Sequence, residues 1–140
     1  MPFSFYWNVA LPDTDAAGIV FAGRFFEWFQ RAEEMMFAEM GYPYRQLFDT
    51  HFGMPAVHVE ITYDSPLFLG SKALIELSVS NLTERAYTAD FHVKEANEDR
   101  KVAEGHIRHR FVTLLQGKGI EGVLVEEDLK RALEKYESIS

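Results

Sequence analysis

Two carboxylates and three small residues stand directly before a predicted helix rich in aromatic residues, in the segment DTDAAGIVFAGRFFEW over residues 13–28. If the helix begins near Ala22 to Arg24, its first backbone N–H groups have no partner inside the helix and carry a partial positive charge. Asp15 lies one short loop upstream. We therefore expect a carboxylate and an electropositive helix end to face a common space.

This pairing suits acyl transfer, in which N–H donors polarise a carbonyl group while a carboxylate attacks it or activates water. A thioester is a suitable target, because its thiolate leaving group needs less help from a proton donor than an amine or alkoxide does. Gly18 and Gly23 lack a Cβ atom, so backbone or substrate can approach closely there. The pattern also fits an ordinary turn or helix entry, which is the role we expect for Asp13.

The elements around this segment are a strand and a long helix. The pattern predicts a strand from Phe3 to Ala10 and a helix from Arg24 to Met40, which Gly41 and Pro43 terminate. The apolar residues cover more than half of the helix circumference, so we expect neighbours on several sides. Glu33 falls within this apolar arc and needs a partner, most simply a salt bridge.

Four β-like segments follow a short helical turn near residues 44–48, and short connectors between them indicate antiparallel hairpins. Residues 117–119 (Gly-Lys-Gly) predict a flexible joint, and residues 126–137 a charged C-terminal helix. The segments are Ala56–Tyr63, Ala73–Thr83, Tyr87–Glu95 and Val102–Leu115. An antiparallel sheet of about five strands around one long helix satisfies this order, so we predict an α+β hotdog fold in one domain over residues 1–140.

The composition narrows the function classes. With 14 basic and 22 acidic residues the net charge is −8, which opposes binding to nucleic acid, although a few local Lys and Arg side chains can still hold a small anion. No run approaches 18 apolar residues and the N-terminus lacks the basic flank of a secretory signal, so we expect a cytoplasmic protein without a membrane partner. There is no Cys, and the five His form no helical ligand pair, so we predict no metal.

The segment DTDAAGIVFAGRFFEWFQRAEEMMF resembles the opening motif of the 4-hydroxybenzoyl-CoA thioesterase family. In that family an Asp-x-Asp-x-x-Gly-(Val/Ile)-Val loop leads into an aromatic helix carrying Trp-Phe-x-Arg-Ala. The matching positions are Asp13, Asp15, Gly18, Ile19, Val20, Trp28, Phe29, Arg31 and Ala32. A second stretch, MPAVHVEITYDSP over residues 54–66, is similar to the corresponding strand of thioesterases that act on 1,4-dihydroxy-2-naphthoyl-CoA, which favours an aromatic acyl group.

The resemblance implies an acyl-CoA thioesterase in which Asp15 is the nucleophile or general base. The backbone N–H of Ala22, assisted by that of Gly23, becomes the oxyanion donor, and Gly18 lies close to the substrate. Many members carry His at the position of Ala22 and Asn at that of Arg24, so the part these side chains play is open, and Arg24 is a candidate for meeting an anionic group. No cofactor is implied beyond the coenzyme A of the substrate. The resemblance further implies a homodimer or homotetramer with active sites between subunits.

Other basic side chains are candidates for contacts with substrate. His58 lies on a predicted strand and faces away from its apolar neighbours. It is either a hydrogen-bonded structural residue or a substrate contact. His106, Arg108 and Arg110 share one face of another strand, where they pair with acids or hold the phosphates of coenzyme A. Arg85 lies in a predicted hairpin that aligns with family positions holding those phosphates, although the neighbouring Glu84 departs from the basic cluster of some members.

Three other functions share part of this pattern. A non-catalytic acyl-CoA-binding or regulatory hotdog module would bind the same ligand without turnover. A hotdog hydratase or dehydratase is disfavoured because its usual His and acid pair is not evident. An aspartyl phosphotransferase would share the Asp-x-Asp motif but needs a parallel sheet and a longer chain.

Overall fold

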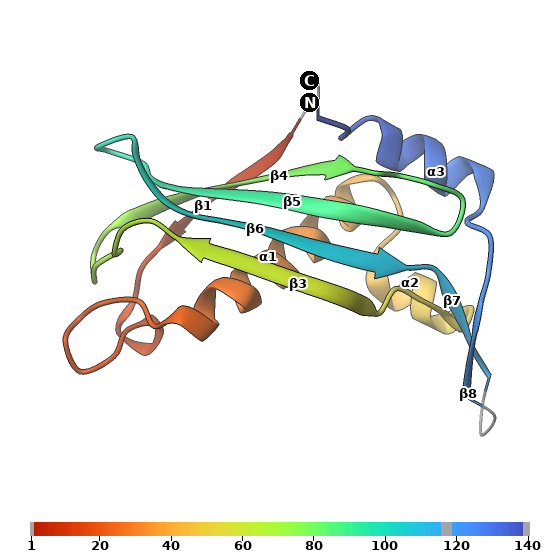
Figure 1. Ribbon diagram of the computed structural model, residues 1–140, viewed down its shortest axis with the longest axis horizontal. Coiled ribbons are helices and arrows are strands. Elements are labelled where there is room, and N and C mark those ends of the chain that lie inside the picture. Colours follow the sequence, from red (N-terminus) through yellow and green to blue (C-terminus); the bar gives the residue numbers. More distant parts are fainter. Residues whose placement is uncertain (1, 116–118, 139–140) are drawn as a thin grey trace.

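Five antiparallel strands form the main sheet in the computed structural model, which describes residues 2–115 and 119–138 (Figure 1). Their order across the sheet is β1-β4-β5-β6-β3, so β1 and β3 are the edge strands. The bounds are Phe3–Asn8 for β1, Ala56–Tyr63 for β3, Lys72–Ser80 for β4, Ala86–Glu95 for β5 and Arg100–Arg110 for β6. Alternate residues of β4 are buried and half-buried, as period-two patterning predicts for a sheet with one covered face.

The long helix α1, Ala22–Glu39, covers that face and lies behind the sheet in Figure 1. Phe29 stacks on Phe91 of β5 with ring centroids 4.2 Å apart. Gly105 of β6 allows this approach, because a Cβ atom there would lie 2.6 Å from the Phe29 ring. The helix also contacts α2, and only its polar side, at Gln30, Arg31 and Glu34, remains exposed. The hotdog arrangement of sheet and helix is confirmed.

The segment predicted as one strand over Val102–Leu115 is two strands in different sheets. β6 ends at Arg110, and β7, Val112–Leu115, pairs with β2, Phe52–Gly53, and β8, Gly119–Gly122. The N–H of Phe111 still donates to the carbonyl of Arg85 at 2.9 Å, one residue beyond the β5–β6 ladder, whereas the N–H of Leu114 donates to the His51 carbonyl at 2.7 Å in the second sheet. Of the predicted Gly-Lys-Gly joint, Gly117 and Lys118 lie outside the described residues, and Gly119 begins β8 with φ 92°.

The remaining helices are short. η1, Leu11–Asp13, precedes the loop to α1, α2 spans Tyr44–Asp49, and α3 spans Glu127–Glu134. The predicted C-terminal helix was therefore too long at its end. After α3 the backbone pairs with β4 instead, since Val79 N–H donates to the Tyr136 carbonyl at 2.8 Å and Ser138 N–H to the Val79 carbonyl at 3.0 Å.

Candidate active site

The N-terminus of α1 is the first feature of the site. Phe21 is its N-cap residue with extended φ and ψ of −78° and 150°, and no side chain in the described part of the chain caps this helix end. Ala22 and Gly23, the first two residues of the helix, are exposed. The partial positive charge of the helix end is thus available to a ligand.

A cavity of about 340 Å³ lies beside this helix end. Its walls come from α1, the loop before it and the chain that follows β3, and they are formed by Ile19, Val20, Ala22, Phe25, Tyr63, Asp64, Ser65, Pro66 and Leu67. The Tyr63 hydroxyl donates to the Ala22 carbonyl at 2.9 Å, which ties the end of β3 to the helix start. Partial burial raises the pKa of Tyr63, so this donor stays protonated.

Asp15 lies in the tight loop that precedes the cavity. Its Oδ1 atom accepts hydrogen bonds from the N–H groups of Ala17 at 2.9 Å and Ile19 at 3.4 Å. Gly18 has φ 75°, a left-handed conformation that favours glycine and closes the loop. The loop is held by Val20 N–H donating to the Leu67 carbonyl at 2.9 Å. Ala22 lines the cavity, whereas Asp15 is exposed and does not, so its catalytic role stays a prediction.

Asp13 and Arg24 form the support beneath the loop. Asp13 is buried and accepts hydrogen bonds from Trp7 Nε1 at 3.1 Å and from the Ala10 N–H at 2.9 Å, which agrees with its predicted structural role. Arg24 Nε lies 3.5 Å from Asp13, and its guanidinium also pairs with Glu27. Because two acids already balance the charge of Arg24, its expected role toward an anionic group stays a prediction without support from this geometry.

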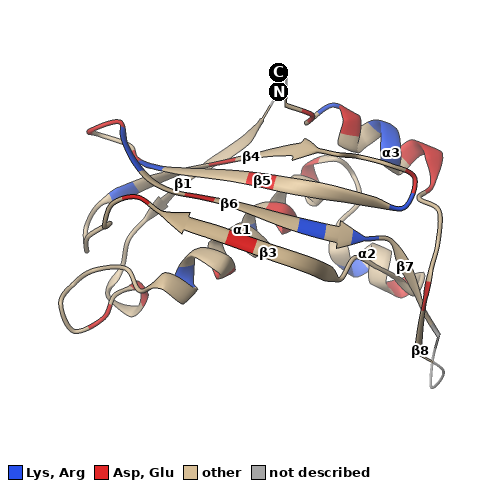
Figure 2. Cartoon of the chain, in the orientation of Figure 1, with Lys and Arg blue, Asp and Glu red and all other residues tan. Residues whose placement is uncertain are grey.

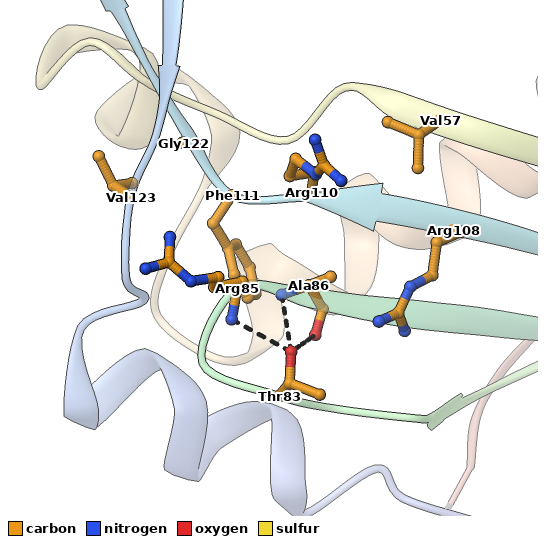
Figure 3. A pocket seen from close by; sticks show the side chains of 9 residues that line it. All are labelled: Val57, Thr83, Arg85, Ala86, Arg108, Arg110, Phe111, Gly122 and Val123. Atoms are coloured by element: carbon orange, nitrogen blue, oxygen red, sulfur yellow. Dashed lines mark hydrogen bonds between the residues drawn. The ribbon is translucent and has the colours of Figure 1, made fainter.

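A second cavity, of about 440 Å³, collects three arginines where β5 begins and β6 ends (Figure 3). Arg85 comes from the turn before β5, and Arg108 and Arg110 come from β6, which has blue segments near its end in Figure 2. Arg108 donates to the Asn81 carbonyl at 2.7 Å and to Thr88 Oγ1 at 3.0 Å. No acid in residues 2–115 or 119–138 forms a salt bridge with any of the three. The cavity is therefore suited to an anion.

The other sequence candidates lie apart from both cavities. His106 shares the exposed sheet face but pairs with Asp90, with 2.6 Å between Nδ1 and Oδ1. His58 is exposed on the edge strand β3, and its Nε2 atom is 3.4 Å from Glu60 Oε2. In the described residues no group of three or more His, Asp and Glu side chains is placed to hold a metal ion. None of the helices described is long and apolar enough to cross a membrane.

Sequence reasoning missed two features of this region. Tyr63 was not singled out, although it lies in the stretch MPAVHVEITYDSP, because its partner Ala22 is 41 residues away in the chain. The union of Arg85 with Arg108 and Arg110 was also missed, since it depends on how β5 and β6 pair: Ala86, next to Arg85, lies opposite Arg110. The only signal in the sequence was the alternation along β6, which places Arg108 and Arg110 on the same face of the strand.

Comparison with known proteins shows the family of the chain. A family profile described as the thioesterase-like superfamily matches residues 9–133. A 1,4-dihydroxy-2-naphthoyl-CoA hydrolase of Gloeothece citriformis is 32% identical over 107 residues, which cover 75% of this chain and 75% of the relative.

Solved structures share the fold. A 1,4-dihydroxy-2-naphthoyl-CoA thioesterase from Synechocystis has a TM-score of 0.85 at 21% identity, over 95% of this chain and 96% of that one. The 4-hydroxybenzoyl CoA thioesterase from Pseudomonas sp. strain CBS-3 has a TM-score of 0.84 at 18% identity, over 94% and 98% of the two chains. With its hotdog fold and a profile match over most of its length, the chain belongs to the thioesterase-like superfamily.

Proposed function

We propose that this chain is an acyl-CoA thioester hydrolase that releases a free acid and coenzyme A. The observation that carries the proposal is the uncapped N-terminus of α1 beside a cavity of about 340 Å³, in a member of the thioesterase-like superfamily. The names of its curated relatives support hydrolysis of CoA thioesters. The reaction needs no cofactor beyond the coenzyme A that is part of the substrate.

In this mechanism the N–H groups of Ala22 and Gly23 stabilise the negative charge that develops on the thioester oxygen. Asp15 either attacks the carbonyl carbon, giving a mixed anhydride that water then hydrolyses, or removes a proton from the attacking water. In both routes the carbon–sulfur bond breaks and the thiolate of coenzyme A leaves. The proposal requires the Asp15 carboxylate to reach substrate bound at the helix end.

The two cavities divide the substrate between them. Apolar walls at Val20, Phe25 and Leu67 suit an aromatic acyl group, in line with the naphthoyl and hydroxybenzoyl substrates in the names of related proteins. The cavity of Arg85, Arg108 and Arg110 suits the phosphates of coenzyme A, because guanidinium groups bind phosphate oxygens through paired hydrogen bonds. Self-association as a homodimer or homotetramer and a cytoplasmic location complete the proposal.

A thiol-release assay tests this function with benzoyl, naphthoyl, phenylacetyl and straight-chain CoA thioesters. We expect turnover, with kcat/KM for at least one aromatic thioester about tenfold above the straight-chain ones, roughly 1.4 kcal/mol of discrimination. Binding of every thioester without release would favour a non-catalytic acyl-CoA-binding module instead.

Ala22→Pro tests the oxyanion donor itself. Proline removes one N–H, yet it fits the first helical position and the extended conformation of Phe21 before it. Loss of an oxyanion donor lowers kcat about a hundredfold or more, whereas the control Ala22→Ser keeps the N–H and should keep most activity. Equal activity of the two variants would exclude this donor.

A further inference from the structure

A third cavity, of about 190 Å³, lies between α1, α2 and the end of β6, and we call it the Glu33 cavity. It shares no lining residue with the cavity at the helix start, and Glu33 is eleven residues beyond Ala22, a rise of about 16 Å along α1. Its walls are Gln30, Glu33, Tyr44, Phe48, Met54 and His109.

A buried ion pair forms the inner wall. His109 Nε2 lies 2.7 Å from Glu33 Oε2, His109 Nδ1 lies 2.8 Å from the Met54 carbonyl, and the Tyr87 hydroxyl donates to Glu33 Oε2 at 3.1 Å. Only 2% of Glu33 and 9% of His109 are exposed. Burial by itself lowers the pKa of His109, but the hydrogen bond and charge of Glu33, with the Met54 carbonyl, outweigh burial and raise it.

Packing alone does not explain this pair. Desolvation of two charges largely cancels their attraction, so a buried ion pair seldom stabilises a fold more than apolar residues of the same volume would. Here the pair borders an open cavity instead of filling the core. A buried charged residue with a raised pKa beside a cavity, such as His109, is a common mark of a ligand site.

The size and chemistry of the cavity indicate the ligand. An engineered apolar cavity of about 150 Å³ holds benzene, so one aromatic ring fits here. Tyr44 and Phe48, whose ring centroids are 5.6 Å apart, and Met54 supply apolar contact. Because the carboxylate and the imidazolium neutralise each other, a neutral ligand is favoured over an ion.

We propose that the Glu33 cavity binds a neutral single aromatic ring that carries a hydroxyl group, with the hydroxyl donating to the Glu33 carboxylate. A carboxylate has about four acceptor positions, and the side chains of His109, Tyr87 and Tyr44 already bond that of Glu33. About one position is left for the hydroxyl of the ligand. Gln30 is a further polar residue in the cavity wall. The site is independent of the proposed hydrolysis.

The test uses phenol as the probe and toluene as the comparison, on the full chain with isotope-labelled methionine methyl groups. We expect phenol to shift the NMR signal of the Met54 methyl group saturably, and toluene to bind about tenfold more weakly, since it lacks the hydrogen bond to a charged acceptor. Glu33→Gln should weaken phenol binding about tenfold, while the control Glu34→Gln, exposed at the next position, should leave it unchanged.

Met54→Trp provides a second variant that leaves the ion pair in place. It fills the cavity and should abolish phenol binding, so the proposal stays testable if Glu33→Gln does not fold. An unshifted Met54 methyl group at millimolar phenol would overturn the proposal. So would equal affinity for phenol and toluene, or phenol binding that Met54→Trp leaves intact. These experiments measure binding directly and not thiol release. A negative result would therefore count against the Glu33 cavity as a ligand site and leave the thioesterase proposal untouched.

Discussion

At the residue scale, Arg85 is the side chain that tests the proposed site for the phosphates of coenzyme A. It lines the cavity with Arg108 and Arg110 and has no acidic partner in the described residues. We predict that Arg85→Ala raises KM for an acyl-CoA about tenfold with little change in kcat, because a charge-assisted contact to phosphate is lost equally from ground state and transition state.

The matched comparison for Arg85→Ala is an acyl-pantetheine thioester, which lacks the nucleotide phosphates. Its steady-state KM should be the same for the variant and the parent protein. Arg131→Ala, at an exposed arginine of α3, is the control and should change neither parameter. An equal rise in KM for both thioesters would remove the phosphates as the partner of Arg85.

The buried pair of His109 and Glu33 links stability to pH. The folded-state pKa of His109 is raised above its ordinary value of about 6.5. The stabilisation is therefore fully present below about pH 6.5 and is lost as pH rises through the folded-state pKa. Urea unfolding of the wild type and His109→Gln from pH 6 to 9 should show a difference in unfolding free energy that shrinks with rising pH. A difference that grows would contradict the ion pair.

The role of a single residue could be predicted where its type and its sequence neighbours alone demand a partner or a turn. Glu33, placed in an apolar arc, was expected to need a charged partner, and His109 supplies it. Asp13 was expected to be structural and is buried with three polar neighbours. Arg85 and Tyr63 depend on contacts between distant segments, which no local pattern encodes.

At the scale of elements, the contact between α1 and β6 depends on the absence of a side chain at Gly105. A Cβ atom there would lie 2.6 Å from the Phe29 ring and 3.1 Å from the Glu60 carbonyl oxygen. We predict that Gly105→Ala lowers the unfolding free energy by about 1–3 kcal/mol, as overpacking usually does. Gly122→Ala, where a Cβ atom meets nothing within 4 Å, should change it little in the same urea titration. Similar losses in both variants would contradict this packing.

The elements with strong periodicity were predictable, and the others were not. The bounds of β3 matched, and α1 differed by two residues at its start and one at its end, because a continuous pattern defines each. The break at Phe111 between β6 and β7 was missed, since both segments are β-like and only hydrogen bonds to distant backbone separate them. β2, with two residues, is too short to give a periodic signal.

At the scale of the whole molecule, the exposed edge strand β3 is the feature that most favours self-association. Val57 and Val59 are 55% and 42% exposed, and their strand has a free hydrogen-bonding edge beyond the five-stranded sheet. Such edges favour pairing with another chain. The acidic and basic residues are distributed over several elements (Figure 2).

We predict a homodimer or a larger even assembly that uses β3. Light scattering after gel filtration should give at least twice the chain mass of 16.1 kDa. Val59→Lys should shift the mass toward the monomer, since it places a charge in the contact, whereas Leu114→Lys, on an exposed position of β7, should not. A monomeric parent protein at micromolar concentration would contradict the assembly, and an unaltered mass in Val59→Lys would exclude the β3 edge.

The central claim is that the Asp15 carboxylate acts on a thioester held at the N-terminus of α1, and Asp15→Asn tests it most directly. The substitution preserves shape and removes the charge, with Asp99→Asn in the exposed β5–β6 turn as the matched control. The measurement is the single-turnover rate of thiol release from the preferred acyl-CoA. We expect this rate to fall about a hundredfold or more in Asp15→Asn and to stay unchanged in Asp99→Asn. Parent-like release by Asp15→Asn would contradict the claim.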